Sequence, residues 1–141
     1  MLERLKENHF LWFQGPMTLW GIDLFTQSSI PGDRIPAHWV FSFDKLIHFL
    51  IYMVFAWAVD RGITNQSRFP LLVKHHYLIT FVIIAVYGAS DEIHQYFVPK
   101  RSCSLLDWLA DCFGAVVYLT YAWLRDRRRS LVALDATKAD G

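Results

Sequence analysis

The chain has 141 residues and a formal net charge of +1, with 54% hydrophobic, 16% aromatic and 19% charged residues. This length leaves room for one domain, and the composition is too apolar for a disordered chain and apolar enough for a membrane protein. No basic stripe runs along a soluble face, so we expect no nucleic acid partner.

Four segments of low charge predict the helices. They cover residues 8–22, 46–59, 75–90 and 105–124. None is a charge-free run of eighteen residues, the usual threshold for a spanning helix. Their polar residues gather at segment ends, however, where a helix meets the interface or a bundle interior. We therefore predict an all-α fold: a polytopic membrane protein with a transmembrane four-helix bundle.

Stretches with loop composition separate these segments. Residues 28–36 and 60–70 are rich in glycine, proline and polar residues, and Pro99 ends the third segment because proline disfavours helix at the residue before it. We predict one domain over residues 1–141, with a core at about 44–124. We expect the basic tail, 125–141, to be disordered and cytoplasmic.

The distribution of lysine and arginine predicts the orientation. Ten of these residues lie in the N-terminal stretch, the loop after the second segment and the C-terminal tail, whereas four lie in the other two loops. Positive charge is enriched on the cytoplasmic side of membrane proteins. We therefore expect a multi-pass membrane protein with both termini cytoplasmic.

Three polar clusters then fall at the outer membrane face. They are Asp44, Lys45 and His48 at the start of the second segment, Asp91, Glu92 and Gln95 at the end of the third, and Lys100, Arg101, Asp107 and Asp111 around the start of the fourth. Ionisable groups beside an apolar run are costly to desolvate and mark a functional site by default. Their convergence predicts one site.

Helical spacing supports this convergence. Asp44 and His48 are four residues apart, and so are Asp91 and Gln95, and Asp107 and Asp111. Residues four apart share a helix face, so each cluster presents a polar stripe toward the others. Gly114 follows the last stripe and is small enough to let another helix approach closely.

The chemistry of the cluster allows two interpretations. In the first, Asp91, Glu92, His48 and Asp107 act as acid, base or proton relay. Ligand binding then falls to the remaining polar residues of the cluster: Asp44, Lys45, Gln95, Lys100, Arg101 and Asp111. In the second, the same residues pair with one another and hold the bundle together. No recognised metal-ligand signature occurs, so we predict no metal and assign no cofactor.

The ordered motifs resemble the VanZ-like family. The matching motifs are Asp44-Lys45-x-x-His48-Phe49-x-x-Tyr52, Asp91-Glu92-x-His94-Gln95-x-Phe97-Val98-Pro99-x-Arg101 and Asp107-x-x-Ala110-Asp111-x-x-Gly114. Lys100 stands where the family often has glycine, and Asp111 where asparagine is common. The resemblance implies a small polytopic protein of the bacterial cell (inner) membrane. The family is named for a member linked to resistance to the glycopeptide teicoplanin.

Two functional hypotheses follow. In the first, an outward-facing site binds or modifies an envelope lipid or lipid-linked glycan precursor, with Lys100 and Arg101 holding a phosphate. Its partners are membrane lipids, including a phosphate-bearing lipid-linked precursor. In the second, the protein is a non-catalytic membrane scaffold or partner-binding protein. A soluble helical protein is a third, remote alternative.

Cysteine labelling tests the predicted orientation. In intact cells, a membrane-impermeant thiol reagent should modify Asp33→Cys, in the first loop, and leave Asn65→Cys, in the second loop, unmodified. Lysed cells, in which both positions become accessible, provide the control. Labelling of position 65 alone in intact cells would reverse the topology and place the polar site in the cytoplasm.

Overall fold

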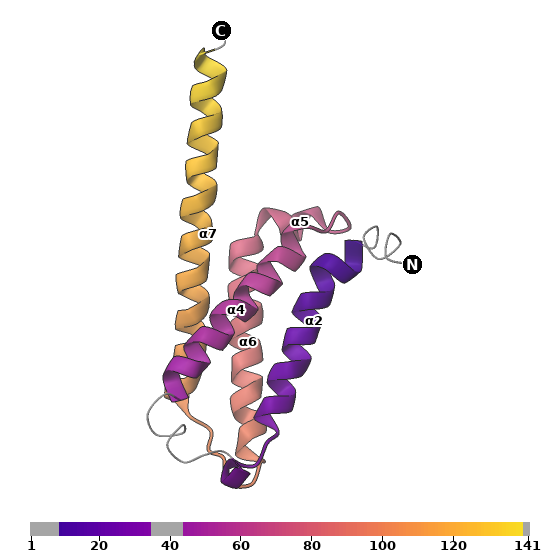
Figure 1. The fold of residues 1–141 in the computed structure, drawn as a ribbon, viewed down its shortest axis with the longest axis vertical. Helices are drawn as coiled ribbons and strands as arrows, with labels where there is room; N and C mark the ends of the chain where they lie inside the picture. Colours follow the sequence, from indigo (N-terminus) through magenta and orange to yellow (C-terminus); the bar gives the residue numbers. More distant parts are fainter. Residues whose placement is uncertain (1–8, 35–43, 140–141) are drawn as a thin grey trace.

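The computed structural model describes residues 9–34 and 44–139, and within these ranges all secondary structure is helical. The elements are α2 (His9–Ser28), the short 3-10 helix η1 (Gly32–Arg34), α4 (Asp44–Thr64), α5 (Pro70–Lys74), α6 (His76–Tyr96) and α7 (Leu105–Ala139) (Figure 1). This confirms the predicted all-α class. Helices α2, α4, α6 and the first half of α7 lie side by side.

Three of these helices are long and apolar enough to cross a membrane: Asp44–Thr64, His76–Tyr96 and Leu105–Lys138. They correspond to the second, third and fourth predicted segments. Helix α2 corresponds to the first segment but is not one of the three, because Gln14, Asp23 and Gln27 dilute its apolar residues. The predicted count of four spanning helices is therefore not confirmed.

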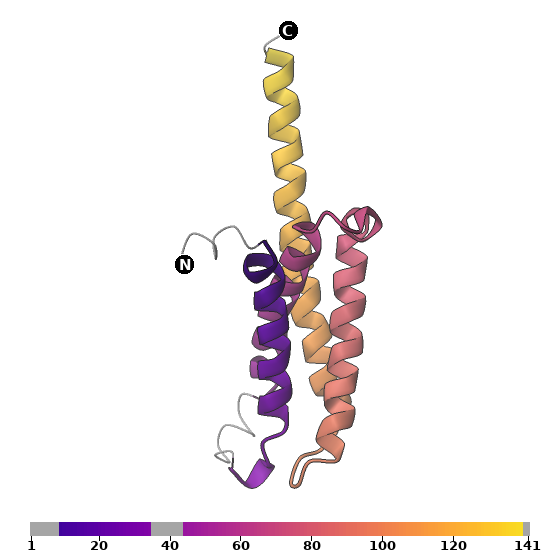
Figure 2. The same cartoon turned by 90° about the vertical axis from the view of Figure 1, so that its right-hand side faces the viewer.

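The observed helices extend beyond the predicted segments. Helix α6 continues through Asp91 and Glu92 to Tyr96, so the polar residues of the motif are helical. Helix α7 continues through the tail to Ala139, where the sequence predicted disorder. Its last turns project beyond the bundle (Figures 1 and 2). The difference has a local cause: residues 125–139 contain no proline or glycine and are rich in alanine, leucine and arginine, which favour helix.

The core lies where α4 packs against α7 and α6, with α4 and α7 in the most extensive contact. Its buried residues come from all four long helices: Leu24, Tyr52, Phe55, Ala56, Val59, Ile63, Ile84, Ala115, Tyr118 and Ala122. Many other large apolar side chains are exposed, among them Leu78, Val86 and Leu106. An exposed apolar exterior around a packed centre is the pattern expected in lipid. Helices suit that environment because each one satisfies its own backbone hydrogen bonds.

Gly114 sets the distance between α4 and α7. A Cβ atom at this position would overlap the carbonyl oxygen of Phe49 and lie 3.0 Å from the amide nitrogen of Met53. The predicted role of Gly114 in close helix approach is therefore confirmed. Because α4 and α7 carry the first and third polar clusters, this contact also sets how closely those clusters meet.

Side chains attach α2 to the other helices. Trp20 donates its indole hydrogen to the carbonyl oxygen of Ile51 at 3.3 Å, and the hydroxyl of Tyr87 donates to the carbonyl oxygen of Gly21 at 2.5 Å. Near the opposite end of α2, the amide of Gln14 donates to the carbonyl oxygen of Gly62 at 3.2 Å. These bonds come from α2 itself and from α6, so α2 belongs to the packed unit.

The replacement Gly114→Ala tests the close contact. Its methyl group would force α4 and α7 apart, and overpacking of this kind typically costs about 1–3 kcal/mol. We expect a lower thermal unfolding midpoint in detergent. The matched control is Gly21→Ala, whose Cβ would meet Phe55 at an ordinary 3.6 Å. Equal stability of the two variants would contradict the proposed contact.

Candidate functional site

Three helix ends meet at one end of the bundle: the start of α4, the end of α6 and the start of α7 (Figure 1). The prediction that distant polar clusters would converge is confirmed by three contacts. Lys45 and His48 on α4 both reach aspartates of α7. Glu92 on α6 reaches Ser104, the residue immediately before α7.

The inner group of the cluster consists of His48, Glu92 and Asp111. Nδ1 of His48 lies 2.9 Å from Oδ1 of Asp111, and one ligand-type atom from each residue lies within 4.8 Å of the others. Asp111 is fully buried and Glu92 is 3% exposed. Gly88 makes room for this arrangement, since a Cβ there would lie 2.9 Å from Oδ2 of Asp111.

The outer group consists of Asp44, Lys45 and Asp107. Nζ of Lys45 lies 2.7 Å from Oδ1 of Asp107 and 3.8 Å from Oδ2 of Asp44. Lys45 thus bridges the first turns of α4 and α7. The Lys45 side chain is about half exposed, so this bridge lies at the mouth of the cluster.

Glu92 connects α6 to the N-terminus of α7. Its Oε2 accepts a hydrogen bond of 2.6 Å from the backbone N–H of Ser104. The hydroxyl of Ser104 in turn accepts from the N–H of Asp107 at 3.3 Å, which is the N-cap arrangement that satisfies free amides at a helix start. Ser104 is therefore the N-cap of α7.

Asp91 and Gln95 form a smaller pair on α6. The amide of Gln95 donates to Oδ2 of Asp91 at 3.1 Å, and both side chains are buried. His94 points elsewhere: its Nε2 lies 3.0 Å from the hydroxyl of Ser29, and its ring packs on Phe25. Within this second motif, Glu92 thus joins the cluster, whereas His94 contacts α2 and the residue after it.

Arg101 forms no ion pair with any residue that the structure describes. Its Nε and one terminal nitrogen donate to the carbonyl oxygens of Ile30 and Gln27, each at 3.3 Å. These carbonyls lie at the end of α2, where helix geometry leaves acceptors free. Of the cations near the cluster, Lys45 therefore pairs with Asp107, whereas Arg101 contacts backbone carbonyls.

Lys100 has an unusual backbone conformation. Its φ is 61°, in the left-handed region that glycine adopts without strain. The backbone is held there by a close approach: Gly32 donates its N–H to the carbonyl oxygen of Pro99 at 3.0 Å, and a Cβ on Gly32 would overlap the carbonyl oxygen of Lys100. A lysine at this position therefore adds a charged side chain at some conformational cost.

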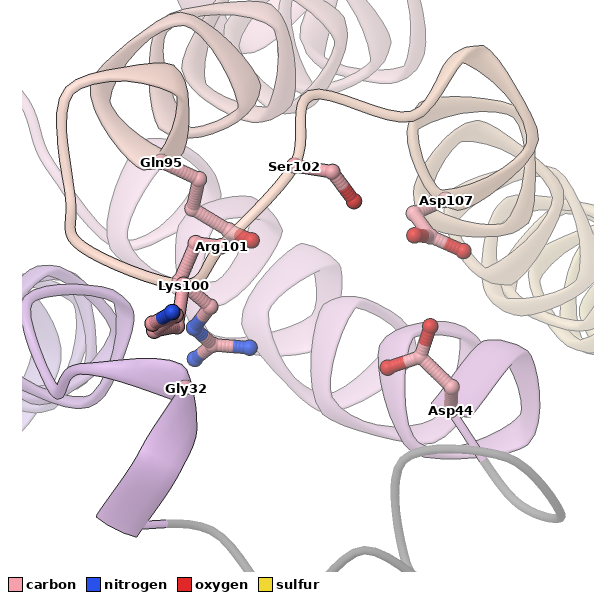
Figure 3. Close-up of a pocket in the computed structure, with 7 residues that line it drawn as sticks. All are labelled: Gly32, Asp44, Gln95, Lys100, Arg101, Ser102 and Asp107. Carbon is pink, nitrogen blue, oxygen red and sulfur yellow. The ribbon is translucent and has the colours of Figure 1, made fainter.

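A small pocket opens beside these residues. It is lined by Gly32, Asp44, Gln95, Lys100, Arg101, Ser102 and Asp107, with a volume of about 80 Å³. Figure 3 shows Asp44 and Asp107 together on one side, with Lys100 and Arg101 on the other beside Gly32. A cavity of about 10–15 Å³ holds one water molecule. The pocket is several times larger, so it can hold a group the size of a phosphate.

Negative charge exceeds positive charge in the cluster. Its carboxylates are Asp44, Asp91, Glu92, Asp107 and Asp111, and the described side chains that pair with them include one lysine and one histidine. Carboxylates held this close in a poorly solvated site cannot all remain ionised without a proton or a cation. The cluster therefore carries a surplus of acidic groups.

A second buried cluster lies at the other end of the bundle, and the sequence did not predict it. Asp60 on α4 is 3% exposed; its Oδ1 lies 2.6 Å from Nδ1 of His76, and the hydroxyl of Tyr118 donates to its Oδ2 at 2.8 Å. Asp60 follows an otherwise apolar stretch of α4, and His76 begins α6. Because these residues have partners on three helices, we interpret the cluster as structural.

Comparison with known proteins supports the resemblance noted in the sequence. The model of a family described as VanZ/LLP1 matches residues 5–125, most of the chain and all three motifs. No curated protein and no solved structure matches the chain.

Proposed function

Because this chain belongs to the VanZ/LLP1 family, we propose that it is a membrane protein whose polar cluster faces outward. We propose that the cluster binds or modifies an envelope lipid or lipid-linked glycan precursor through a phosphate group. A link to glycopeptide (teicoplanin) resistance is part of this proposal. The pocket between the basic pair and the carboxylates carries the argument.

The pocket has the features that phosphate binding needs. Lys100 and Arg101 line one side, and both can donate charge-assisted hydrogen bonds to phosphate oxygens. Arg101 is not neutralised by any carboxylate in the described part of the chain. The volume of about 80 Å³ accommodates a phosphate but not a sugar chain, so the rest of the ligand would lie along the exposed apolar helix surfaces.

The carboxylates next to the pocket suit acid–base chemistry. Asp44 and Asp107 line the pocket itself, and His48 lies behind them in contact with Asp111. Histidine and carboxyl groups are the usual general acids and bases. In a catalytic version of the proposal, Asp107 accepts a proton from a hydroxyl or water in the pocket, and His48, which has a ring nitrogen within 4.8 Å of an Asp107 oxygen, takes up that proton.

The fold supports the proposed orientation. The end opposite the polar cluster holds the last turn of α4, the loop before α5, α5 itself and the α7 extension (Figure 1). These segments carry Arg61, Arg68 and Lys74, and then Arg125, Arg127, Arg128 and Arg129. Fewer cations lie at the cluster end. The charge asymmetry counted along the sequence is therefore also an asymmetry between two ends of the bundle, which favours an outward-facing cluster.

A scaffold function is the second candidate, and specific contacts favour it. Lys45 with Asp107, His48 with Asp111 and Glu92 with Ser104 all join different helices. A protein that only needed a rigid bundle would have such pairs. That candidate gives no role to Lys100, which is exposed and adopts a conformation suited to glycine.

Lys100→Gly separates the two candidates. Glycine fits the φ of 61°, so the variant should fold at least as stably as the wild type while losing one cation from the pocket. Loss of one exposed charge contact, worth about 1 kcal/mol, should weaken binding of a polyprenyl phosphate about fivefold. The measurement is binding to the purified protein in nanodiscs, beside its thermal unfolding midpoint.

Two controls make the result specific. Lys74→Ala removes an exposed cation at the opposite end of the bundle and should leave binding unchanged. The polyprenol without phosphate should bind wild type and Lys100→Gly equally and weakly. Equal binding of the phosphate lipid and the alcohol by wild-type protein would reject the proposed function and favour the scaffold.

A further inference from the structure

The inner group has the composition of a metal site. His48, Glu92 and Asp111 lie on α4, α6 and α7 respectively, so their ligand atoms approach a common point from three directions. These atoms lie within 4.8 Å of one another. An ion bound about 2.1 Å from each ligand keeps its ligands within about 4.2 Å, so small side-chain rotations would complete the set.

Two carboxylate oxygens in this group have no hydrogen-bond partner among the described residues: Oε1 of Glu92 and Oδ2 of Asp111. Glu92 is 3% exposed and Asp111 is fully buried, so solvent does not replace the missing partners. The other oxygen of each carboxylate is engaged, with Ser104 and with His48. A buried acceptor without a partner is costly, and a bound cation would remove that cost.

The outer group already has its cation. Asp44, His48 and Asp107 also place ligand-type atoms within 4.8 Å, but Nζ of Lys45 lies 2.7 Å from Asp107. Among the described residues, the ion-pair partner of the inner carboxylates is His48, which is itself a member of the group. A metal ion is therefore needed at the inner group and not at the outer one.

We propose that His48, Glu92 and Asp111 bind one divalent transition-metal ion, Mn²⁺ or Zn²⁺. Carboxylates suit Mn²⁺ and imidazole suits Zn²⁺, so a mixed set accepts either. Glu92 and Asp111 together carry two negative charges, which balance a divalent ion when His48 is neutral. The sequence predicted no metal because the three ligands lie on three helices and form no local signature.

This metal site goes beyond the proposed function. The presence of the ion does not depend on that function; only the role that we give to the ion rests on the proposed function. An ion at the inner group would lie near Asp107, which lines the pocket and has an oxygen within 4.8 Å of a His48 ring nitrogen. There it would attract the phosphate that Lys100 and Arg101 hold and would offset the repulsion from the carboxylates. Metal binding itself requires no lipid.

The test measures metal retention by purified full-length protein in detergent. After EDTA treatment and re-equilibration with Mn²⁺ or Zn²⁺, elemental analysis should find one ion per chain, and the ion should raise the thermal unfolding midpoint. Glu92→Gln and Asp111→Asn preserve side-chain shape and should each weaken retention at least tenfold. The control Asp33→Asn, an exposed carboxylate in η1, should bind like wild type.

A spectroscopic measurement on wild-type protein covers the case in which a variant does not fold. Pulsed EPR of bound Mn²⁺ should show coupling to a nitrogen nucleus, the signature of the His48 imidazole. Failure of folded wild type to retain either ion, or equal retention by wild type and both amide variants, would overturn the proposal. A higher thermal unfolding midpoint at acidic pH, with no change when metal is added, would likewise overturn the proposal, since protons would then neutralise the carboxylates.

The two proposals can fail separately. Metal retention without preference for the phosphate lipid would keep the metal site and reject the proposed function. Preference for the phosphate lipid in metal-free protein, with no ion retained, would reject the metal site alone.

Discussion

The contact between His48 and Asp111 is the interaction on which the site depends. It joins α4 to α7 at 2.9 Å inside the bundle, just before Gly114 brings the two helices closest together. A fully buried aspartate is costly unless it is paired. Because helix packing buries Asp111, its carboxylate needs polar partners, and His48 contacts one of its two oxygens.

The remaining polar residues are arranged around this contact. Lys45 compensates Asp107 at the mouth, and Glu92 compensates the free amide of Ser104 at the start of α7. Arg101 is directed to the end of α2, and Lys100 stands beside the pocket. The pocket thus sets the basic pair opposite Asp44 and Asp107, while Glu92 and Asp111 are buried in the bundle. Our two proposals rest on this arrangement: an anionic ligand beside the basic pair and a cation between the buried carboxylates.

Much of this arrangement could be predicted from the sequence. The helix starts could be predicted from the apolar segments and from the proline- and glycine-containing stretches between them. The convergence of the polar clusters could be predicted because successive membrane-spanning helices run in opposite directions. The partners of Arg101 could not be predicted, because backbone carbonyls at the end of α2 carry no sequence signal. The Asp60 cluster was missed for a related reason: its partners, His76 and Tyr118, lie 16 and 58 residues away, beyond the reach of local spacing. The helical tail was missed because charge suggested disorder where helix propensity decided the outcome.

A double-mutant cycle between His48 and Asp111 tests the central claim most directly. The free energies of unfolding of His48→Ala, Asp111→Ala and the double variant would be compared with wild type in mixed detergent. Residues in one buried network show coupling energies of about 0.5–3 kcal/mol, and we predict at least about 1.5 kcal/mol for this pair. Effects that add within about 0.5 kcal/mol would contradict a direct interaction across the α4–α7 interface and the site built on it.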